Sequence, residues 1–561
     1  MRLKCLWRNG TFALLVLVVP GKPAVAGTAP VAGSTLAETS SAPWNVDRIP
    51  QAIQGILMAS GATMAISEPT PDNAYQRINS AQWVRDLYLS RRFAPFWTTD
   101  RDVEALAQGL AGIKADGLDP TDYHLSQLIT AWRQLNAATT PMERARFDVA
   151  ATTAYVSALV DLRQGKVDPA SLDLRWNFTS PAQKHGEEEP GFYEVLQAHD
   201  IVRGFREAPP QVLFYTRLRQ AMLRLLEIRD SGGWPLITSS APLRPGIADA
   251  AVIQLRQRLA TAGYLNRPTD LPEFYDEALL TAVKRYQAEQ YLEPDGVVGD
   301  ITLAALNVPI QVRLDQLRVN MERARWLFKE LQGTFVIVDI AGYKIALYRD
   351  GRPIWRSRVQ VGKPFRRTPV FQSTIDHVTF NPTWTVPPTI QTEDLLPRIL
   401  NNPRYLAENR IDVIDKTGKR VDPMAVDWRH AAGLTLRQQA GPDNALGQVA
   451  IRFANPYSVY LHDTPHRELF NGQRRATSSG CIRVEDPLKL VELLFNDPQR
   501  WGAAGIALQL ATGKTTHISL PVKIPILLAY WTVDLRDDGR VTYKPDIYGY
   551  DQALLEALGK Q

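Results

Sequence analysis

The hydrophobic periodicity of this chain changes near residue 334, and the change limits what the chain can fold into. Before that point apolar residues recur every three or four positions, as in "ARFDVAATTAYVSALVDLRQGK", which is the period of an amphipathic helix. From Thr334 they alternate, as in "TFVIVDIAGYKIALYRDGRPIWRSRVQVG", which predicts strands joined by a Tyr-Arg-Asp-Gly-Arg hairpin turn. Because 561 residues exceed what one core usually organises, we expect a multidomain α+β protein.

Composition and turn signals divide the chain into consecutive segments. A Gly/Pro/Ser-rich break at 231–247 separates a long helical region from a compact module of two helices, a Pro-Asp-Gly turn and a third helix. The predicted segments are a signal peptide (1–26), a flexible leader (27–43), an α-helical scaffold domain (44–235), a three-helix module (247–308), a β-rich domain (334–545) with a helical and irregular insertion (392–428), and a C-terminal tail (546–561).

The first 26 residues have the pattern of a secretory signal. Arg2, Lys4 and Arg8 form a basic start, "TFALLVLVVP" is a short apolar run, and small residues stand at Ala24 and Ala26. The apolar run is roughly half the length that a membrane-spanning helix needs. We therefore expect cleavage and export, with a retained N-terminal anchor as the alternative.

The charge balance argues against nucleic acid as a partner. The first 26 residues hold four of the 64 basic side chains and none of the 59 acidic ones, so the rest of the chain is close to neutral. Without a basic surplus there is no electrostatic reason to expect nucleic-acid binding. With 45% hydrophobic and 22% charged residues, the composition is that of an ordinary globular protein.

Export would leave a single thiol, because Cys5 lies in the signal and Cys481 is the only other cysteine. A lone cysteine cannot form a disulfide within the chain, and in an oxidising compartment it is exposed to mispairing and oxidation. It is either an inert buried residue or a reactive one. The neighbouring residues decide between these interpretations.

The neighbours of Cys481 favour a reactive thiol. Gly480 allows backbone conformations that are closed to other residues, and "CIRV" predicts a short strand. Asp486 and Pro487 are the N-cap and first residue of a following helix. We therefore place the thiol on a turn between loop and strand, close to backbone N–H groups that could hold an oxyanion.

An imidazole is the usual group that activates a thiol, and His462 is the better candidate. It ends an alternating strand whose Val459 and Leu461 would face the core, whereas His466 follows Pro465 in a loop. The spacing of the two histidines could suggest a metal site, but Pro465 disfavours the helix that such a pair needs. The other six histidines have no catalytic partner visible in the sequence: His124, His185, His199, His377, His430 and His517.

The stretches "YLHDTP" and "SSGCIRV" resemble the signature of the L,D-transpeptidases with a YkuD-type catalytic domain. Ser479 stands where most members have a second histidine, and the large periplasmic subgroup often has serine there. "VGKPFRRTPVF", "NPTWTVPPTI", "GPDNALG" and "PDIYGYD" look like segments of that subgroup. The stretch "DGVVGDITLAALN" resembles the small peptidoglycan-binding domain, which would make 247–308 such a module and 392–428 a lid.

The resemblance implies an activity and roles for several residues. Members cleave the bond between the third residue of a peptidoglycan stem and the fourth, D-Ala, and transfer the acyl group to an amine of a second stem. Cys481 would be the nucleophile and His462 its base, with the backbone carbonyl of Asp463 orienting the imidazole. Ser479, Gly480 and Cys481 would supply N–H groups to the oxyanion.

Three further residues are candidates for substrate binding. Arg483 projects to the same face as Cys481 and suits the carboxylates of an acidic stem, or it forms a surface ion pair with Glu485 or Asp486. Trp384 and Tyr460 are either pocket walls or core aromatics, and the resemblance favours pocket walls. No cofactor and no metal are expected. The implied partners are peptidoglycan stems and glycan, other cell-wall synthesis proteins, and carbapenem-type β-lactams as inhibitors.

The sequence leaves the fate of the acyl group open. Transfer to water would make the protein an L,D-carboxypeptidase, and transfer to a protein lysine would make it a lipoprotein-anchoring enzyme. A third alternative is a wall-binding scaffold without catalysis, for which Ser479 is the only argument.

Overall fold

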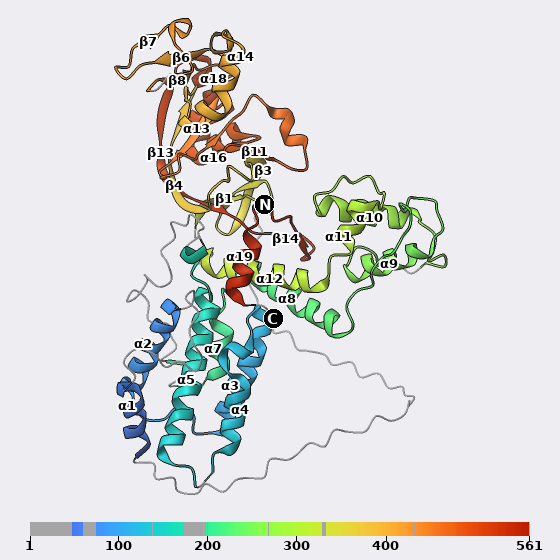
Figure 1. The fold of residues 1–561 in the computed structure, drawn as a ribbon, viewed down its shortest axis with the longest axis vertical. Coiled ribbons are helices and arrows are strands. Elements are labelled where there is room, and N and C mark those ends of the chain that lie inside the picture. Colours follow the sequence, from blue (N-terminus) through green and yellow to red (C-terminus); the bar gives the residue numbers. More distant parts are fainter. Residues whose placement is uncertain are drawn as a thin grey trace, which may run out of the picture. The chain divides into compact units, whose positions relative to one another are not determined.

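The computed structural model describes residues 48–59, 74–136, 138–172, 194–195, 198, 200–266, 269–327, 333–430 and 433–559 (Figure 1). The predicted signal peptide (1–26) and leader (27–43) lie outside these residues. No helix in the described part of the chain is both long and apolar enough to cross a membrane.

The N-terminal helices form a bundle around one long central helix, α5 (Pro141–Gln164). A capping box of Thr140 and Glu143 starts α5, and Pro141 occupies its first turn. Asp148 of α5 is buried and accepts hydrogen bonds from the Tyr88 hydroxyl and from two backbone N–H groups. The other helices of the bundle are α1 (Ile49–Ala59), α2 (Ala74–Ser90), α3 (Asp100–Gly112), α4 (Leu125–Gln134) and α7 (Ile201–Glu207).

The bundle ends earlier than the predicted boundary at residue 235. Helix α8 (Leu213–Asp230) packs instead against α12 (Ile310–Leu327), in a cluster that also contains Val533. No helix was predicted at α12, although Leu314, Leu317, Met321 and Ala324 recur at helical spacing and all pack in this cluster. Several charged residues of α12 are buried, and Arg325 forms an ion pair with Glu322 at 2.6 Å.

The three-helix module has a separate core. Its helices are α9 (Ala250–Thr261), α10 (Glu277–Glu289) and α11 (Asp300–Leu306). The predicted Pro-Asp-Gly turn lies between α10 and α11, where Gly296 has φ of 80° and the Asp295 carboxylate accepts a hydrogen bond from Val297 N–H.

The β-rich region is a sheet that closes on itself. Its order is β11-β3-β12-β10-β9-β4-β13-β1-β2, and a further β3–β2 pairing joins all strands except β11 into a ring. The β2–β3 hairpin turns at Asp350 and Gly351, both with positive φ, as the sequence predicts. The strands are β1 (Thr334–Asp339), β2 (Lys344–Arg349), β3 (Arg352–Gly362), β4 (Phe371–Phe380), β9 (Val449–Phe453), β10 (Leu461–His462), β11 (Ala476–Ser478), β12 (Ile482–Val484) and β13 (Thr516–Ala529).

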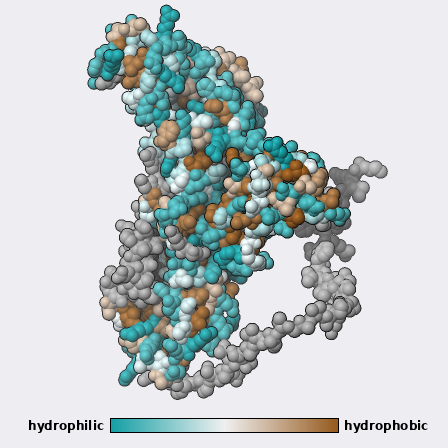
Figure 2. Space-filling view, turned by 45° about the vertical axis from the view of Figure 1, so that its right-hand side comes forward, coloured by the Kyte–Doolittle hydropathy of each residue, from teal (hydrophilic) through white to brown (hydrophobic). Residues whose placement is uncertain are grey.

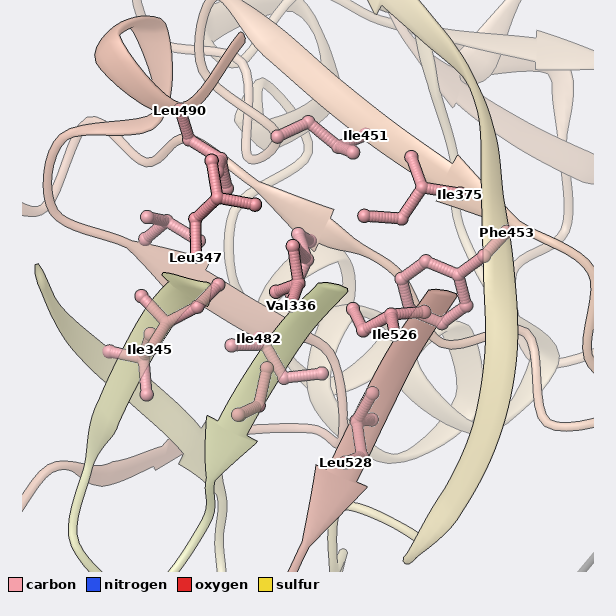
Figure 3. Packing of buried hydrophobic residues seen from close by; sticks show 14 of the residues in the cluster. Val336, Ile345, Leu347, Ile375, Ile451, Phe453, Ile482, Leu490, Ile526 and Leu528 are labelled. Carbon is pink, nitrogen blue, oxygen red and sulfur yellow. The ribbon is translucent and has the colours of Figure 1, made fainter. Parts of the chain in front are cut away.

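Apolar side chains from these strands and from α16 (Pro487–Phe495) fill one core. Figure 3 shows Val336, Ile451 and Ile482 gathered in it, with Leu490 contributed by α16. Asp486 caps α16 by accepting a hydrogen bond from Lys489 N–H, and Pro487 is its first residue, both as predicted. This core fixes the strands that carry the candidate site.

The insertion is more ordered than predicted for 392–428. It contains a four-stranded sheet of order β5-β8-β6-β7, from β5 (Trp384–Thr385) to β8 (Thr435–Gln438), and it has its own apolar cluster. The helical part of the prediction is confirmed by α14 (Leu396–Asn401) and α15 (Tyr405–Glu408), whereas the strands were missed because they are short. The remaining elements are β6 (Ile411–Ile414), β7 (Arg420–Val421), α13 (Pro388–Ile390) and a π-helical turn (Gln391–Leu395).

The segment 546–561 was predicted to be a tail, and this prediction is wrong for the described part of it. Helix α19 (Tyr550–Leu558) buries Leu554 and Leu558 in a cluster with Val167 and Val319. Asp551 of α19 forms an ion pair with the buried Arg323 of α12 at 2.6 Å. On the face drawn in Figure 2, hydrophobic residues lie in separate groups among hydrophilic ones.

Candidate active site

Two short parallel strands carry the predicted catalytic residues. In β10 and β12, Leu461 is paired with Ile482, and His462 with Arg483. Leu461 and Ile482 lie in the core, so His462 and Arg483 face the opposite side of the sheet. Cys481 immediately precedes β12, and alternation places it on the same side as Arg483. The structure therefore brings Cys481, His462 and Arg483 to one face of the barrel.

The turn before β12 is fixed by the side chain of Ser478, which the sequence analysis missed. Its Oγ donates a hydrogen bond to the Cys481 carbonyl oxygen at 2.6 Å and accepts one from Gly480 N–H at 3.1 Å. Gly480 has φ of 119°, a conformation that favours glycine. Because the Gly480 N–H is engaged, the oxyanion donors that remain are those of Ser479 and Cys481, which make no hydrogen bond within the described residues.

A chain of hydrogen bonds from the C-terminal segment supports this turn. Thr368 Oγ1 donates to the Gly480 carbonyl oxygen at 2.8 Å, and Thr368 N–H donates to the Tyr548 hydroxyl at 3.1 Å. The Tyr548 hydroxyl in turn donates to the Gly362 carbonyl oxygen at 2.7 Å. Thr368 and Tyr548 lie 180 residues apart, so no local pattern could have connected them.

The His462 imidazole is held in one tautomer. Its Nδ1 lies 2.5 Å from the carbonyl oxygen of Asp463, the contact that the resemblance implied, and this leaves Nε2 free to accept a proton. The Asp463 carboxylate accepts a hydrogen bond from Gln448 N–H at 2.9 Å and forms an ion pair with Arg467. Burial lowers the pKa of His462 to about 3, and the charge of Arg483 acts in the same direction.

The Cys481 thiol is in an environment that keeps it protonated at rest. Burial raises its pKa, although a hydrogen bond from the backbone of Tyr460 and the charges of Arg452 and Arg483 oppose this rise. The thiol sulfur lies 3.6 Å from the Ser458 carbonyl oxygen, an acceptor for a thiol proton. With the pKa of His462 lowered, the resting pair is a neutral thiol and a neutral imidazole at pH 7.

Arg483 does not form the alternative surface ion pair. Glu485 pairs instead with Arg358, and Asp486 caps α16. Arg483 Nη1 donates to the amide oxygen of the buried Gln360 at 3.2 Å, and its Nε is buried without a hydrogen-bond partner among the described residues. Among the described residues Arg483 thus has no carboxylate partner, and it lies on the face that carries Cys481.

Ser479 is connected to the insertion through Arg366. Arg366 Nη1 donates to the Ser479 hydroxyl at 3.0 Å. The same guanidinium forms ion pairs with Glu393, at 2.6 Å, and with Asp394, both in the π-helical turn of the insertion. The residue that departs from the common family pattern is therefore the contact between the catalytic turn and the insertion.

The two predicted aromatic residues occupy different surroundings. The Tyr460 ring lies 5.7 Å from the His462 ring, centroid to centroid, and the Arg452 guanidinium lies 3.7 Å from the Tyr460 ring. Trp384 pairs with Gln438 in the insertion sheet and packs against the apolar cluster there.

The second histidine of the sequence pair, His466, is exposed, and its Nδ1 lies 3.5 Å from a carboxylate oxygen of Glu468. Within the described residues no cluster of three or more His, Cys, Asp or Glu could hold a metal ion.

Comparison with known families agrees with this geometry. Residues 333–498 match the L,D-transpeptidase catalytic domain family YkuD. The chain carries an L,D-transpeptidase catalytic domain. Residues 82–222 match a scaffold domain, and residues 248–306 match a putative peptidoglycan-binding domain. The L,D-transpeptidase domain thus contains both β10 and β12.

A putative L,D-transpeptidase from Haemophilus influenzae is 38% identical over 242 residues, which are 43% of this chain and 48% of that protein. The chain therefore spans about half the length of this relative. Among solved structures, an L,D-transpeptidase fragment from Xylanimonas cellulosilytica is 15% identical, with a TM-score of 0.17, and covers 52% of this chain and 99% of that one. An L,D-transpeptidase solved with imipenem is 14% identical, with a TM-score of 0.16, and covers 36% of this chain and 64% of that one.

Proposed function

We propose that this protein is a periplasmic peptidoglycan L,D-transpeptidase that works through a cysteine acyl-enzyme and links the third residues of neighbouring stems. The observation that carries the proposal is the position of Cys481 and His462 on one face of two paired strands, with the tautomer of His462 set by the Asp463 carbonyl. The match of residues 333–498 to the catalytic family supports the same reaction class.

In the first step the imidazole Nε2 takes the thiol proton while Sγ attacks the carbonyl carbon of the third stem residue. The N–H groups of Ser479 and Cys481 are the donors for the oxyanion that forms. When the bond to D-Ala breaks, the imidazolium gives its proton to the departing amine. A thioester on Cys481 and free D-Ala result.

In the second step an amine of another stem attacks the thioester carbonyl, and the imidazole takes a proton from it. The C–S bond breaks, the new amide bond forms, and the proton returns to the sulfur. Arg483 lies on the same face and pairs with no carboxylate in the described part of the chain, which suits it to a carboxylate of the acidic stem. The Tyr460 ring lies beside His462, which supports its assignment as a wall of the substrate site.

The test is product analysis on a purified disaccharide tetrapeptide. Wild type should release D-Ala and form dimers joined between third residues, and Cys481→Ala and His462→Ala should form none while keeping the circular dichroism of the folded protein. A product that is only the disaccharide tripeptide would indicate a carboxypeptidase, and coupling only to a protein lysine would indicate an anchoring enzyme. Absence of any acylation of Cys481 would indicate a scaffold.

Localisation and partners form part of the same proposal. We expect export with cleavage after residue 26, which sequencing of the mature N-terminus from a periplasmic extract would test. We also expect contacts with peptidoglycan glycan and with other wall-synthesis proteins.

Carbapenem-type β-lactams are the expected inhibitors. A carbapenem carries a strained amide that a thiol can open, so Cys481 should be acylated by such a compound.

A further inference from the structure

A cavity of about 290 Å³ lies away from Cys481, between α8, the three-helix module and the hairpin of β14 (Val533–Leu535) and β15 (Val541–Tyr543). Its lining is strongly cationic, with Asp538 as the only acidic residue among the described residues that form it. The lining arginines come from four separate parts of the chain: Arg217, Arg224, Arg258, Arg313 and Arg540.

Most of these charges are not neutralised within the protein. Arg540 pairs with Glu289 and Asp538, but among the described residues no carboxylate forms an ion pair with Arg217, Arg224, Arg258 or Arg313. Their hydrogen bonds go to neutral groups: the Leu306 and Thr261 carbonyl oxygens and the side-chain amide oxygens of Gln220, Gln290 and Gln316.

Keeping these cations together costs free energy. Arg258 is only 4% exposed. Burial lowers its pKa, and the nearby charge of Arg313 lowers it further. A bound anion would offset this repulsion. It would also replace the favourable interactions with water that the guanidiniums lose when they are buried. The cavity is therefore electrostatically complementary to an anionic ligand.

Aromatic rings hold three of the guanidiniums in place. The Arg258 guanidinium lies 4.0 Å from the Trp234 ring, and those of Arg313 and Arg540 lie 4.4 Å from the rings of Tyr543 and Tyr264. Stacking on a ring leaves N–H groups in the guanidinium planes of Arg258 and Arg313 available for an oxyanion, whereas those of Arg540 already pair with Glu289 and Asp538. The buried Tyr286 side chain also lines the cavity, next to Arg313.

Two ion pairs keep the walls of the cavity together. Arg285 of the three-helix module pairs with Asp538 of the hairpin at 2.6 Å, and Arg540 of the hairpin pairs with Glu289 of the module at 3.1 Å. The cavity thus exists before any ligand binds, which reduces the ordering cost of binding.

We propose that this cavity binds a carboxylate-bearing stem peptide of peptidoglycan, at a second site separate from the catalytic face. The choice of peptidoglycan among anions comes from the wall formed by α9 and α10, because residues 248–306 match a putative peptidoglycan-binding domain. The inference rests on the substrate class of the proposed function but not on catalysis. Binding at this site holds a peptidoglycan strand on the enzyme independently of Cys481.

The test uses the full chain with Cys481→Ala, so that no turnover occurs, and adds the double substitution Arg224→Gln, Arg313→Gln. Arg229→Gln is the matched control, because Arg229 also lies on α8 but does not line the cavity. Hydrogen exchange detected by mass spectrometry is recorded with a disaccharide tetrapeptide and with the same disaccharide lacking the peptide. It reports residues 213–230 and 533–543 separately from residues 478–483.

We expect the disaccharide tetrapeptide to protect residues 213–230 and 533–543, and the double substitution to weaken this binding at least ten-fold while the control does not. The disaccharide without peptide should give no protection there. Protection confined to 478–483, or equal affinity of the double variant and the control, would overturn the proposal. Displacement of the stem by equimolar inorganic phosphate would also overturn it, since it would indicate a general anion site. Protection at 213–230 in a protein that proves inactive would sustain this site and reject only the proposed function.

Discussion

Arg366 donates a hydrogen bond to the Ser479 hydroxyl at 3.0 Å while the same guanidinium pairs with Glu393 and Asp394 of the insertion. The residue two positions before Cys481 is thereby connected to a segment that begins almost a hundred residues earlier. Arg366 itself is largely buried, with 12% of its side chain exposed, so these charge-assisted bonds are partly shielded from water. The insertion and the catalytic turn should therefore loosen together when this contact is removed.

Arg366→Gln should increase hydrogen exchange in residues 388–401 several-fold and lower kcat/KM about ten-fold, since a charge-assisted hydrogen bond contributes about 1.5–3 kcal/mol. Arg398→Gln is the control, because it removes an insertion arginine whose hydrogen bond goes to Tyr405 and not to the turn. If Arg366→Gln exchanges like wild type in 388–401, the contact does not hold the insertion.

Tyr548→Phe should lower kcat more than it raises KM. The substitution removes the hydroxyl that receives the Thr368 N–H and donates to the Gly362 carbonyl, and it leaves both groups unsatisfied at a cost of about 1–3 kcal/mol. Urea unfolding and steady-state kinetics measure the two effects. Tyr550→Phe is the control, since its hydroxyl makes no hydrogen bond within the described residues. Equal kinetics for the two variants would show that the turn does not depend on Tyr548.

The rate at which Cys481 reacts with an alkylating agent should depend on pH as expected for a thiol whose pKa is raised by burial. Because the pKa of Cys481 is raised and that of His462 is lowered to about 3, no thiolate–imidazolium pair forms between pH 4 and 7. The rate of alkylation by iodoacetamide should rise steadily with pH and reach its midpoint above about 8.5, the ordinary thiol value. A plateau of fast alkylation at pH 5–7 would mean that the resting pair is ionised.

Arg483→Gln should raise the KM for the disaccharide tetrapeptide about ten-fold with a smaller change in kcat, because a uniform binding interaction is lost. A stem whose carboxylates are amidated serves as the matched substrate. Wild type and Arg483→Gln should handle the amidated stem alike. If Arg483→Gln weakens the binding of both substrates equally, the role of Arg483 lies in its hydrogen bond to Gln360 and not in carboxylate binding.

Local patterns predicted the parts of the site that depend on neighbours in sequence. Alternation predicted that His462 points away from the core and that Arg483 shares a face with Cys481, and the Asp-Pro pair marked the start of α16, but the pairing of β10 with β12 was not predicted. Support from a distance was not predictable, because Tyr548 and Arg366 act through partners that only folding brings close.

In the fold, too, features set by local sequence were predicted and features set by distant contacts were missed. The change of hydrophobic period separated the helical bundle from the barrel, and the Pro-Asp-Gly turn located the three-helix module. Helix α12 was missed, and its buried charges make sense only in the fold, where Arg318 and Arg325 pair with acidic residues of the same helix and Arg323 pairs with Asp551 of α19. Helix α19 was predicted to be a tail because its apolar face is buried only by residues far away in the sequence, Val319 of α12 and Val167.

The central claim is that Cys481 carries the acyl group. The most direct measurement is the intact mass of the protein after rapid mixing with disaccharide tetrapeptide and acid quenching, followed by peptide mapping. We predict an adduct on Cys481 equal to the disaccharide tetrapeptide minus D-Ala, absent in Cys481→Ala and strongly slowed in His462→Ala. Formation of cross-linked product by Cys481→Ala, or an adduct on another residue, would contradict the account.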